Sequence, residues 1–515
     1  HDIKQNQKSR KQVIYRPEWL EKILKQRVEQ IRYKPEELYI WWWKPCKVNL
    51  LIMTDGFLDY SDADFGLSTF VTALVNDGRS YVKFNITLAH RSSANMGSGI
   101  SGITERIQNF SFNNPSHFTP TKYDVVMLFG ADTGIPGNPN RDFGANYLSD
   151  AELRKIAEFM NNGGGVFATG DHGALGMGLC SAIARVRSMR LWDNASGKVG
   201  MSDSMRNDTN RRGNDASSTF DDQSDDIPQE ISPRMYSSRL HWFWKETYPH
   251  PLLCAPTGVI KVLPDHAHEG ECIIPNDFTL NDILGTPEYP GGIHPEIIAT
   301  STVLNNSNAG GLKANTISHR FGAISAYDGH LAGVGRVSTD ATWHHFVNVN
   351  LIGEITTDTD GNRATEHASV KEGFAFSAAG LAHFEKIKHY YVNIPVWLSR
   401  QAQHTCFNSH IIWETLYKHR VLEASMDSPH IPYDKIPVQV LFTIGTHAKD
   451  VIGKQAGHCR TLKIIFDLIY ERYKEFVFEL DPWRPFTLKE LLENNSSLPH
   501  INTQMITSIA LGSAI

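Results

Sequence analysis

The stretch Gly163–Leu179, GGGVFATGDHGALGMGL, decides the fold of this chain. It predicts a buried strand, Val166–Thr169, that runs into Gly170–Gly173 (GDHG) and then into a helix. Small residues one position before and two positions after Asp171 are what a sharp strand-to-helix turn requires, because bulky neighbours would collide there. Such a turn holds its central side chain over the sheet edge, where helix N–H groups also point. We therefore expect a site around Asp171, beyond the carboxyl end of the strand.

Strands and helices alternate on both sides of this turn. Helical spacing predicts helices at Phe65–Val75 and Ser149–Asn162, and Ser149 and Glu152 have the spacing of a capping box. Short apolar runs predict further strands at Lys47–Thr54, Tyr81–Ala89, Tyr123–Phe129, Phe321–Tyr327 and Gly335–Asp340. Alternation of this kind predicts an α/β fold, with a parallel sheet that carries helices on both faces.

The length of 515 residues indicates more than one domain. Residues 1–45 predict an N-terminal helical arm, with an amphipathic helix at Pro17–Tyr33. Residues 46–355 predict the α/β domain, which a loop-rich insertion interrupts at about residues 195–320. Residues 370–515 have mostly helical spacing and predict a C-terminal helical domain.

Composition and charge exclude several classes of protein. The 50 basic and 56 acidic residues leave no overall positive charge for nucleic acid or an anionic membrane. No run of 18 apolar residues is present, so no membrane-spanning helix is expected. The six cysteines show no CxxC pairing, which favours reduced thiols and a cytoplasmic location. Without a P-loop or a GxGxxG after a strand, no nucleotide cofactor is expected.

Four segments carry a family resemblance through their order along the chain. They are VNLLIMTDG at 48–56, LFGAD at 128–132, the GGG at 163–165 that leads toward the strand-to-helix turn at Asp171 (the elbow), and GRVSTDATWHH at 335–345. In this order the chain resembles the class I glutamine amidotransferase-like superfamily, especially its trehalose-utilisation (ThuA-like) branch. The resemblance covers roughly residues 46–195 and 320–350. It implies a flavodoxin-like domain with an oxyanion loop after the third strand and a histidine after a late strand.

The elbow departs from the amidotransferase pattern. The family carries a nucleophilic cysteine where this chain has Asp171, and Cys180 lies nine residues further on, in the following helix. Glutamine hydrolysis through a thioester is therefore not expected. The ThuA-like branch also lacks this cysteine, so the resemblance in fold is unaffected.

The predicted catalytic residues come from the elbow and from the closing strand. Asp171 could be a nucleophile, a general base or a metal ligand, or it could only cap the following helix. His172, the next residue, is a weaker candidate because its side chain is expected to turn into the wall of the site.

His344 and His345 follow the closing strand and are preceded by Asp340, so they are expected on the same rim. A histidine oriented by a carboxylate is a common acid–base unit, although one of the two histidines could be a satisfied core residue. Amides at Gly130, Gly170 and Gly173 would stabilise developing negative charge.

Two segments are candidates for cation binding. The first holds four suitable ligands for Zn, Mn or Mg, namely Asp265, His266, His268 and Glu269. The alternative for this segment is an exposed polar loop. The second, Asp55–Asp64, contains four aspartates, of which Asp55 and Asp59 lead a possible loop for a hard cation. A helix cap within a solvated loop is the alternative there.

Together these features predict a hydrolase or lyase that acts on a small polar substrate, with a carbohydrate derivative as one candidate class. The elbow aspartate and a rim histidine would carry the reaction, with a divalent metal as an optional addition. A second hypothesis is a catalytically silent ligand-binding or assembly protein with the same fold. A small-molecule ligand and a homo-oligomer are expected under both hypotheses.

Overall fold

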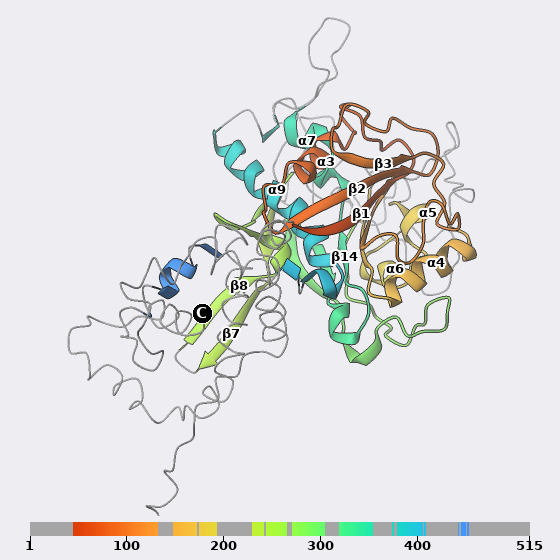
Figure 1. The fold of residues 1–515 in the computed structure, drawn as a ribbon. Helices are drawn as coiled ribbons and strands as arrows, with labels where there is room; N and C mark the ends of the chain where they lie inside the picture. The colour runs from red at the N-terminus through yellow and green to blue at the C-terminus, as the bar shows by residue number, and fades with distance from the viewer. Residues whose placement is uncertain are drawn as a thin grey trace, which may run out of the picture. The chain divides into compact units, whose positions relative to one another are not determined.

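The structure is a computed structural model, shown in Figure 1. It describes residues 45–131, 148–171, 175–192, 229–241, 244–264, 270–303, 319–353, 373–374, 378–404, 406–407, 441, 444–449 and 451–452. The chain forms two compact units. One consists of Cys46–Met235 and Pro249–Phe407 and contains the sheet described below. The other consists of His1–Pro45, Tyr236–Tyr248 and Asn408–Ile515.

Ten strands among the described residues form one sheet, in the order β11-β6-β12-β13-β14-β5-β4-β1-β2-β3. The parallel strands are β1 (Cys46–Thr54), β2 (Val82–His90), β3 (Ile103–Ile107), β4 (Val125–Gly130), β5 (Gly165–Gly170) and β14 (Val337–Asp340). The antiparallel strands are β6 (Gln229–Pro233), β11 (Val262–Leu263), β12 (Glu296–Val303) and β13 (His319–Tyr327). The α/β class predicted from the sequence is therefore confirmed, with a mixed sheet.

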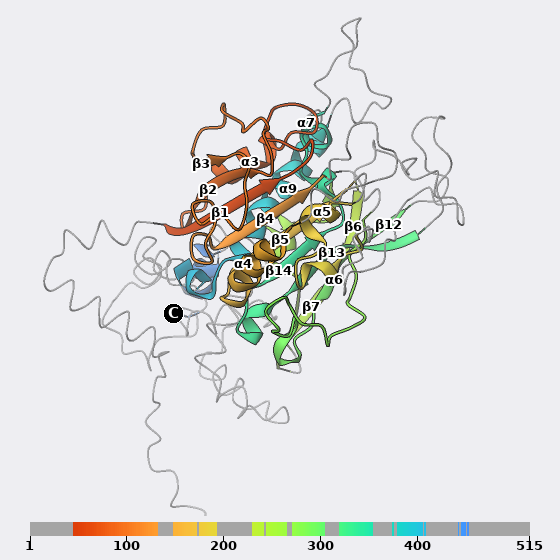
Figure 2. The same cartoon turned by 90° about the vertical axis from the view of Figure 1, so that its right-hand side faces the viewer.

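Helices cover both faces of this sheet. The helix α5 (Met177–Cys180) packs on β4 and β5, and α6 (Val186–Met189) packs on β14. The long helix α9 (Ala378–Leu398) packs on β1, β5 and β14, beside α3 (Ser68–Val75), which also contacts α7 (Asn348–Ile352). Figure 2 shows α5, α6 and α4 (Asp150–Asn161) in front of the sheet and α9 behind it.

The start of α4 confirms the predicted capping box. The hydroxyl of Ser149 accepts from the Glu152 amide at 3.4 Å, and the Glu152 carboxylate accepts from the Ser149 amide at 3.0 Å. The same carboxylate binds Arg91, at the end of β2, at 2.6 Å. Burial by itself would raise the pKa of Glu152. The hydrogen bonds from Ser149 and the charge of Arg91 outweigh this effect, so the pKa is lowered from its usual value.

The expectation of a purely parallel sheet and a loop-rich insertion was wrong in part. Strands β6, β11 and β12 come from the insertion and extend the sheet in antiparallel fashion. β11 has only two residues, and β12 has irregular register, so these strands lack the long apolar runs that identified the parallel strands. The remaining elements of the insertion are short: β7 (Met235–His241), β8 (Trp244–Pro249), η1 (Pro251–Leu253), β9 (Cys254–Ala255), β10 (Gly258–Val259) and η2 (Pro290–Gly292).

The helix α9 belongs to the unit that contains the sheet, although its residues fall within the predicted helical domain. The helix Pro17–Tyr33 lies outside the described residues. The limits of the arm and of the helical domain stay predictions. No helix among the described residues is long and apolar enough to cross a membrane.

The cysteines correct another expectation. Cys46, at the start of β1, and Cys406 form a disulfide, with Cα atoms 6.1 Å apart. These residues are 360 positions apart, so no local spacing in the sequence could identify the pair. Cys180, Cys254 and Cys272 form no disulfide, as expected for reduced thiols, and all three are buried.

Candidate active site

The carboxyl ends of four parallel strands bring the candidate residues to one edge of the sheet. The strands β1, β4, β5 and β14 lie side by side in this spatial order. Thr54 is in register with Phe129, and Phe129 with Thr169, so this row of side chains shares one face. Four further residues lie at or just beyond the strand ends: Asp55, Ala131, Asp171 and Asp340. Ligands of open α/β sheets bind at this edge.

The clearest chemical unit at this edge is the pair formed by His345 and Asp340. Nδ1 of His345 lies 2.7 Å from Oδ1 of Asp340, and both side chains are buried. Because a carboxylate only accepts, Nδ1 carries the proton in this pair and Nε2 is left as the basic nitrogen. In the part of the chain that the structure describes, Nε2 is buried and has no hydrogen-bond partner. The geometry is that of a histidine oriented by a carboxylate.

Two tyrosines of α9 hold this pair in place. The hydroxyl of Tyr390 donates to Oδ2 of Asp340 at 2.6 Å, and that of Tyr391 donates to the main-chain carbonyl of His345 at 2.6 Å. Burial raises the pKa of Tyr390 well above its usual value, and the neighbouring Asp340 adds to the effect. The Tyr390 hydroxyl therefore stays a donor and fixes the carboxylate.

The local backbone explains why the two adjacent histidines diverge. His344 and His345 lie in a single helical turn, η4 (Trp343–His345), in which the Thr342 hydroxyl accepts from the amide of His344 at 2.9 Å. The ring of His344 stacks on Trp343 at 4.4 Å, and its Nδ1 lies 3.0 Å from Oδ1 of Asn350. Only His345 is paired with Asp340.

The elbow at Asp171 is as tight as the sequence indicated. β5 ends at Gly170, and Leu175 and Gly176 both have left-handed backbone conformations, with φ of 63° and 79°. A Cβ atom at Gly170 would collide with the carbonyl of Leu175, and one at Gly130 would lie 2.6 Å from Cα of Gly176. Asp171 is fully buried at this turn. His172 and Gly173 lie outside the described residues.

Arg190 is the important residue that sequence reasoning missed. Its side chain is fully buried, and it donates to main-chain carbonyls at both strand ends and at the elbow. These acceptors are Gly170, Leu175 (3.0 Å), Leu191 (3.1 Å), Asp340 (3.1 Å) and Ala341 (2.7 Å).

Burial lowers the pKa of Arg190, while Cys272, Asp171 and Asp340 oppose this effect. The guanidinium thus offsets the charge of two carboxylates of the site. An arginine in an irregular segment carries no spacing signal, so only tertiary structure could identify its role.

The amide next to the predicted oxyanion residue Gly130 already has a partner. Oδ1 of Asp55 accepts from the amide of Ala131, the residue that follows Gly130, at 2.5 Å. Gly56 lies close by, because a Cβ there would be 3.1 Å from Ala131. Asp55 therefore joins the ends of β1 and β4, and the amide just after Gly130 is not open to a substrate oxygen.

Asp59, the second predicted ligand of the cation loop, stabilises its own turn. Oδ1 of Asp59 accepts from the amide of Ser61 at 2.9 Å and from its hydroxyl at 2.5 Å. Within the described ranges, no group of three or more His, Cys, Asp or Glu side chains is arranged to hold a metal ion. Asp265, His266, His268 and Glu269 lie outside those ranges, so the metal stays a prediction.

Neither of the two reduced cysteines near the site, Cys180 and Cys272, has the character of a nucleophile. Sγ of Cys180 faces the main-chain carbonyl of Thr169 at 3.9 Å from within the core. Cys272 is hydrogen-bonded to Thr339, and burial raises the pKa of its thiol to about 12. A thiol with this pKa is protonated at neutral pH and is a poor nucleophile.

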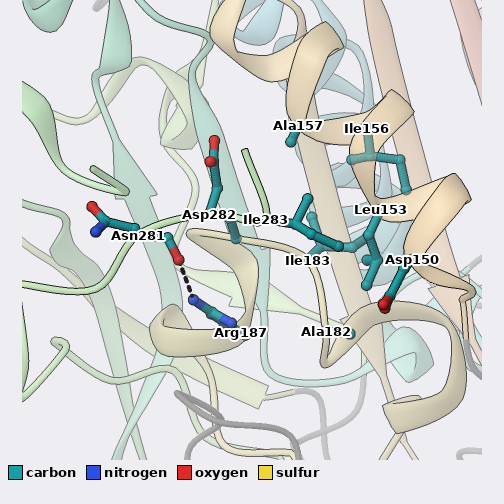
Figure 3. Close-up of a pocket in the computed structure, with 11 residues that line it drawn as sticks. Asp150, Leu153, Ile156, Ala157, Ala182, Ile183, Arg187, Asn281, Asp282 and Ile283 are labelled. Carbon is teal, nitrogen blue, oxygen red and sulfur yellow. Dashed lines mark hydrogen bonds between the residues drawn. The ribbon is translucent and has the colours of Figure 1, made fainter. Parts of the chain in front are cut away.

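A pocket of about 420 Å³ lies elsewhere, between α4, α6 and the segment around Asp282 (Figure 3). Its wall is mainly apolar, with Leu153, Ile156 and Ile183 facing one another, and Arg187 donates to the carbonyl of Asn281 at 2.9 Å. None of its lining residues belongs to the strand-end site. The arrangement of acid and base at the strand ends is the stronger sign of chemistry, because this pocket has no such pair.

Comparisons of the chain with known protein families, with curated proteins and with solved structures gave no match.

Proposed function

We propose that this protein is a hydrolase in which His345 activates water for attack on a small polar substrate. The observation that carries the proposal is the buried pair of His345 and Asp340, with Nε2 as the basic nitrogen. Nε2 would accept a proton from water as the oxygen attacks the electrophilic carbon, and the imidazolium would return this proton to the leaving group as its bond to that carbon breaks. Asp340 would stabilise the imidazolium, and Tyr390 would keep its carboxylate oriented.

Asp171 is the second proposed catalytic group. It follows β5 directly, next to the strand end that carries Asp340, and Arg190 interacts with both carboxylates. Attack by Asp171 itself would leave a covalent intermediate, whereas action as a base would not. Rapid acid quenching followed by mass spectrometry of the intact chain separates these two roles.

The strand order supports the finer proposal of a flavodoxin-like domain. The parallel strands β2, β1, β4, β5 and β14 lie in the spatial order 2-1-3-4-5 when the edge strand β3 is set aside. This is the flavodoxin-like order. It agrees with descent from the amidotransferase-like superfamily, which remains part of the proposal together with a small-molecule substrate and a homo-oligomer.

The disulfide bears on the compartment of the protein, and elemental analysis bears on the proposed metal. A disulfide such as Cys46–Cys406 is typical of oxidising compartments, which argues against the cytoplasmic location predicted from the cysteine spacing. Elemental analysis of the purified chain tests for Zn, Mn or Mg at Asp265–Glu269.

The catalytic proposal is tested with a panel of activated esters, amides and glycosides. For a substrate found in this way, His345→Gln and Asp171→Asn should each lower kcat about 10²–10⁴-fold. The control is His294→Gln, which changes an exposed histidine stacked on Phe278. Circular dichroism and melting curves establish that the variants fold. Undiminished turnover by folded His345→Gln would contradict the mechanism.

The competing hypothesis of a catalytically silent binding protein predicts a different result. Under it, the wild type turns over no member of the panel, and the variants differ only in ligand binding. Size-exclusion chromatography with light scattering measures the oligomer in the same preparations.

A further inference from the structure

Two exposed phenyl rings form a pair beside the candidate site. The side chains of Phe57 and Phe65 are exposed, at 50% and 41%. Both come from the loop that follows β1, and their ring centroids lie 5.7 Å apart in an edge-to-face arrangement. A contiguous exposed aromatic surface of this kind is typical of a binding site.

The pair rests directly on the segment that carries the proposed base. Phe57 and Phe65 each contact the buried ring of Trp343 edge to face, at 5.6 and 5.9 Å. Trp343 begins η4, the turn that ends at His345. Trp343 is fully buried, whereas both phenyl rings keep part of their surface exposed. The rings therefore lie near the pair of His345 and Asp340 (the dyad) without taking part in its hydrogen bonds.

The loop that carries this aromatic pair is acidic. Residues 55–66 include four aspartates and no lysine or arginine, and Asp62 among them is exposed. An exposed carboxylate beside the rings attracts cations and repels anions. Exposed aromatic rings add to the attraction through their negative π faces.

We propose that Phe57 and Phe65 bind the positively charged part of the substrate, an amine or quaternary ammonium whose carbon substituents cover the rings. The proposal rests on the proposed function, because it assigns the substrate class of the same site. The rings determine specificity, while His345 reaches the reacting carbon. Each phenyl contact of this type is expected to change affinity about 2- to 30-fold.

Choline and 3,3-dimethyl-1-butanol test this proposal, because they have the same shape and differ in charge. Binding to the full chain is measured by isothermal titration, with saturation-transfer NMR for weak binding. Choline is expected to bind at least tenfold more tightly than the neutral alcohol. Its affinity should fall as KCl rises from 50 to 500 mM, since part of the attraction is electrostatic. Equal affinities for the two probes, or no choline binding, would overturn the proposal.

Two variants separate the aromatic contribution from the charge. Phe57→Leu/Phe65→Leu keeps the apolar surface and removes the rings, and it should weaken choline binding about tenfold or more. Asp62→Asn should weaken it severalfold. Leu331→Ala, which changes a side chain that is 71% exposed on η3 (Gly329–Ala332), is the control and should bind choline as the wild type does. Unchanged choline affinity in the double variant would overturn the role of the rings.

The binding test is independent of turnover. His345→Gln should still bind choline with wild-type affinity, because the rings and not the dyad contact the probe. Failure of the hydrolase proposal would appear as unchanged turnover in His345→Gln. Failure of the present proposal would appear in the two probe affinities, and preferential binding of methyl β-glucoside over choline would also contradict it.

Discussion

Nε of Arg190 donates to the main-chain carbonyl of Asp340 at 3.1 Å, which attaches a fully buried cation to the strand end that bears the acid of the dyad. The same guanidinium reaches the carbonyl of Gly170 on the neighbouring strand. One side chain thus holds together the elbow and the closing strand, and it offsets the charge of Asp171 and Asp340.

Replacement of Arg190 should therefore destabilise the α/β unit. Arg190→Lys keeps the charge but loses the planar fork, so several buried carbonyls lose their donors. We expect the free energy of unfolding to fall by about 3–5 kcal/mol. Urea unfolding measures this, with Arg320→Lys as the control, because Arg320 is exposed and its guanidinium donates to the hydroxyl of Thr300. Equal losses in the two variants would contradict the role of Arg190.

Asp340→Asn tests the orientation of His345. An amide at this position can donate to Nδ1 and thereby stabilise the wrong tautomer of the imidazole. By analogy with other acid-oriented histidines, kcat should fall about 10³–10⁴-fold while the fold persists. ¹⁵N NMR of the histidine ring measures the tautomer directly. Tyr390→Phe removes only the support of the carboxylate at 2.6 Å and should lower kcat less. A larger effect of Tyr390→Phe than of Asp340→Asn would refute this order of importance.

The glycines of the elbow should not tolerate a methyl group. Gly170→Ala and Gly130→Ala would each force backbone atoms of Leu175 or Gly176 to move, because the added Cβ collides with them. Such overpacking costs about 1–3 kcal/mol, and more where backbone has to shift. Gly99→Ala is the control, since its Cβ would meet nothing within 4 Å. Thermal melts should show lower Tm values for the first two variants only.

The sequence was sufficient for the parts of the fold that depend on local signals. The parallel strands were identified because they are buried on both faces and read as continuous apolar runs, and Ser149 gave the start of α4 through its capping box. Asp171 and Asp340 could be assigned to one edge because parallel strands end together. Contacts distant in sequence gave no such signal. The buried position of Arg190, the support from Tyr390 and the Cys46–Cys406 bond became apparent only in three dimensions.

The disulfide predicts a specific thiol count. When the oxidised chain is unfolded without reductant, four of its six cysteines should react with a thiol reagent, and all six after reduction. Cys254→Ser should lower both counts by one, whereas Cys406→Ser should leave Cys46 reactive. Loss of the bond should also destabilise the chain by about 2–5 kcal/mol, because the unfolded state is less constrained. Six reactive thiols in the oxidised chain would contradict the pairing.

Three buried or half-buried histidines should make stability fall in weak acid. Burial lowers the pKa of His250 to about 3 and those of His330 and His389 to about 4, from an ordinary value of 6.5. The unfolded chain therefore binds more protons between pH 6.5 and 4, so stability is complete above pH 6.5 and is lost as pH falls. Each histidine contributes a slope of at most about 1.4 kcal/mol per pH unit.

His250 provides the sharpest form of this test, because its ring is buried and meets the Trp397 ring edge to face, with centroids 4.7 Å apart. In His250→Gln, the dependence of unfolding free energy on pH between 6 and 4 should become shallower by about one proton. The variant should also be somewhat less stable at pH 7, where the imidazole is neutral and accepts from the Leu252 amide at 3.3 Å. Lys83→Gln, which changes an exposed side chain on β2, is the control and should keep the wild-type slope. Urea unfolding at closely spaced pH values measures both slopes, and equal slopes in His250→Gln and the wild type would show that this histidine is protonated in the folded chain.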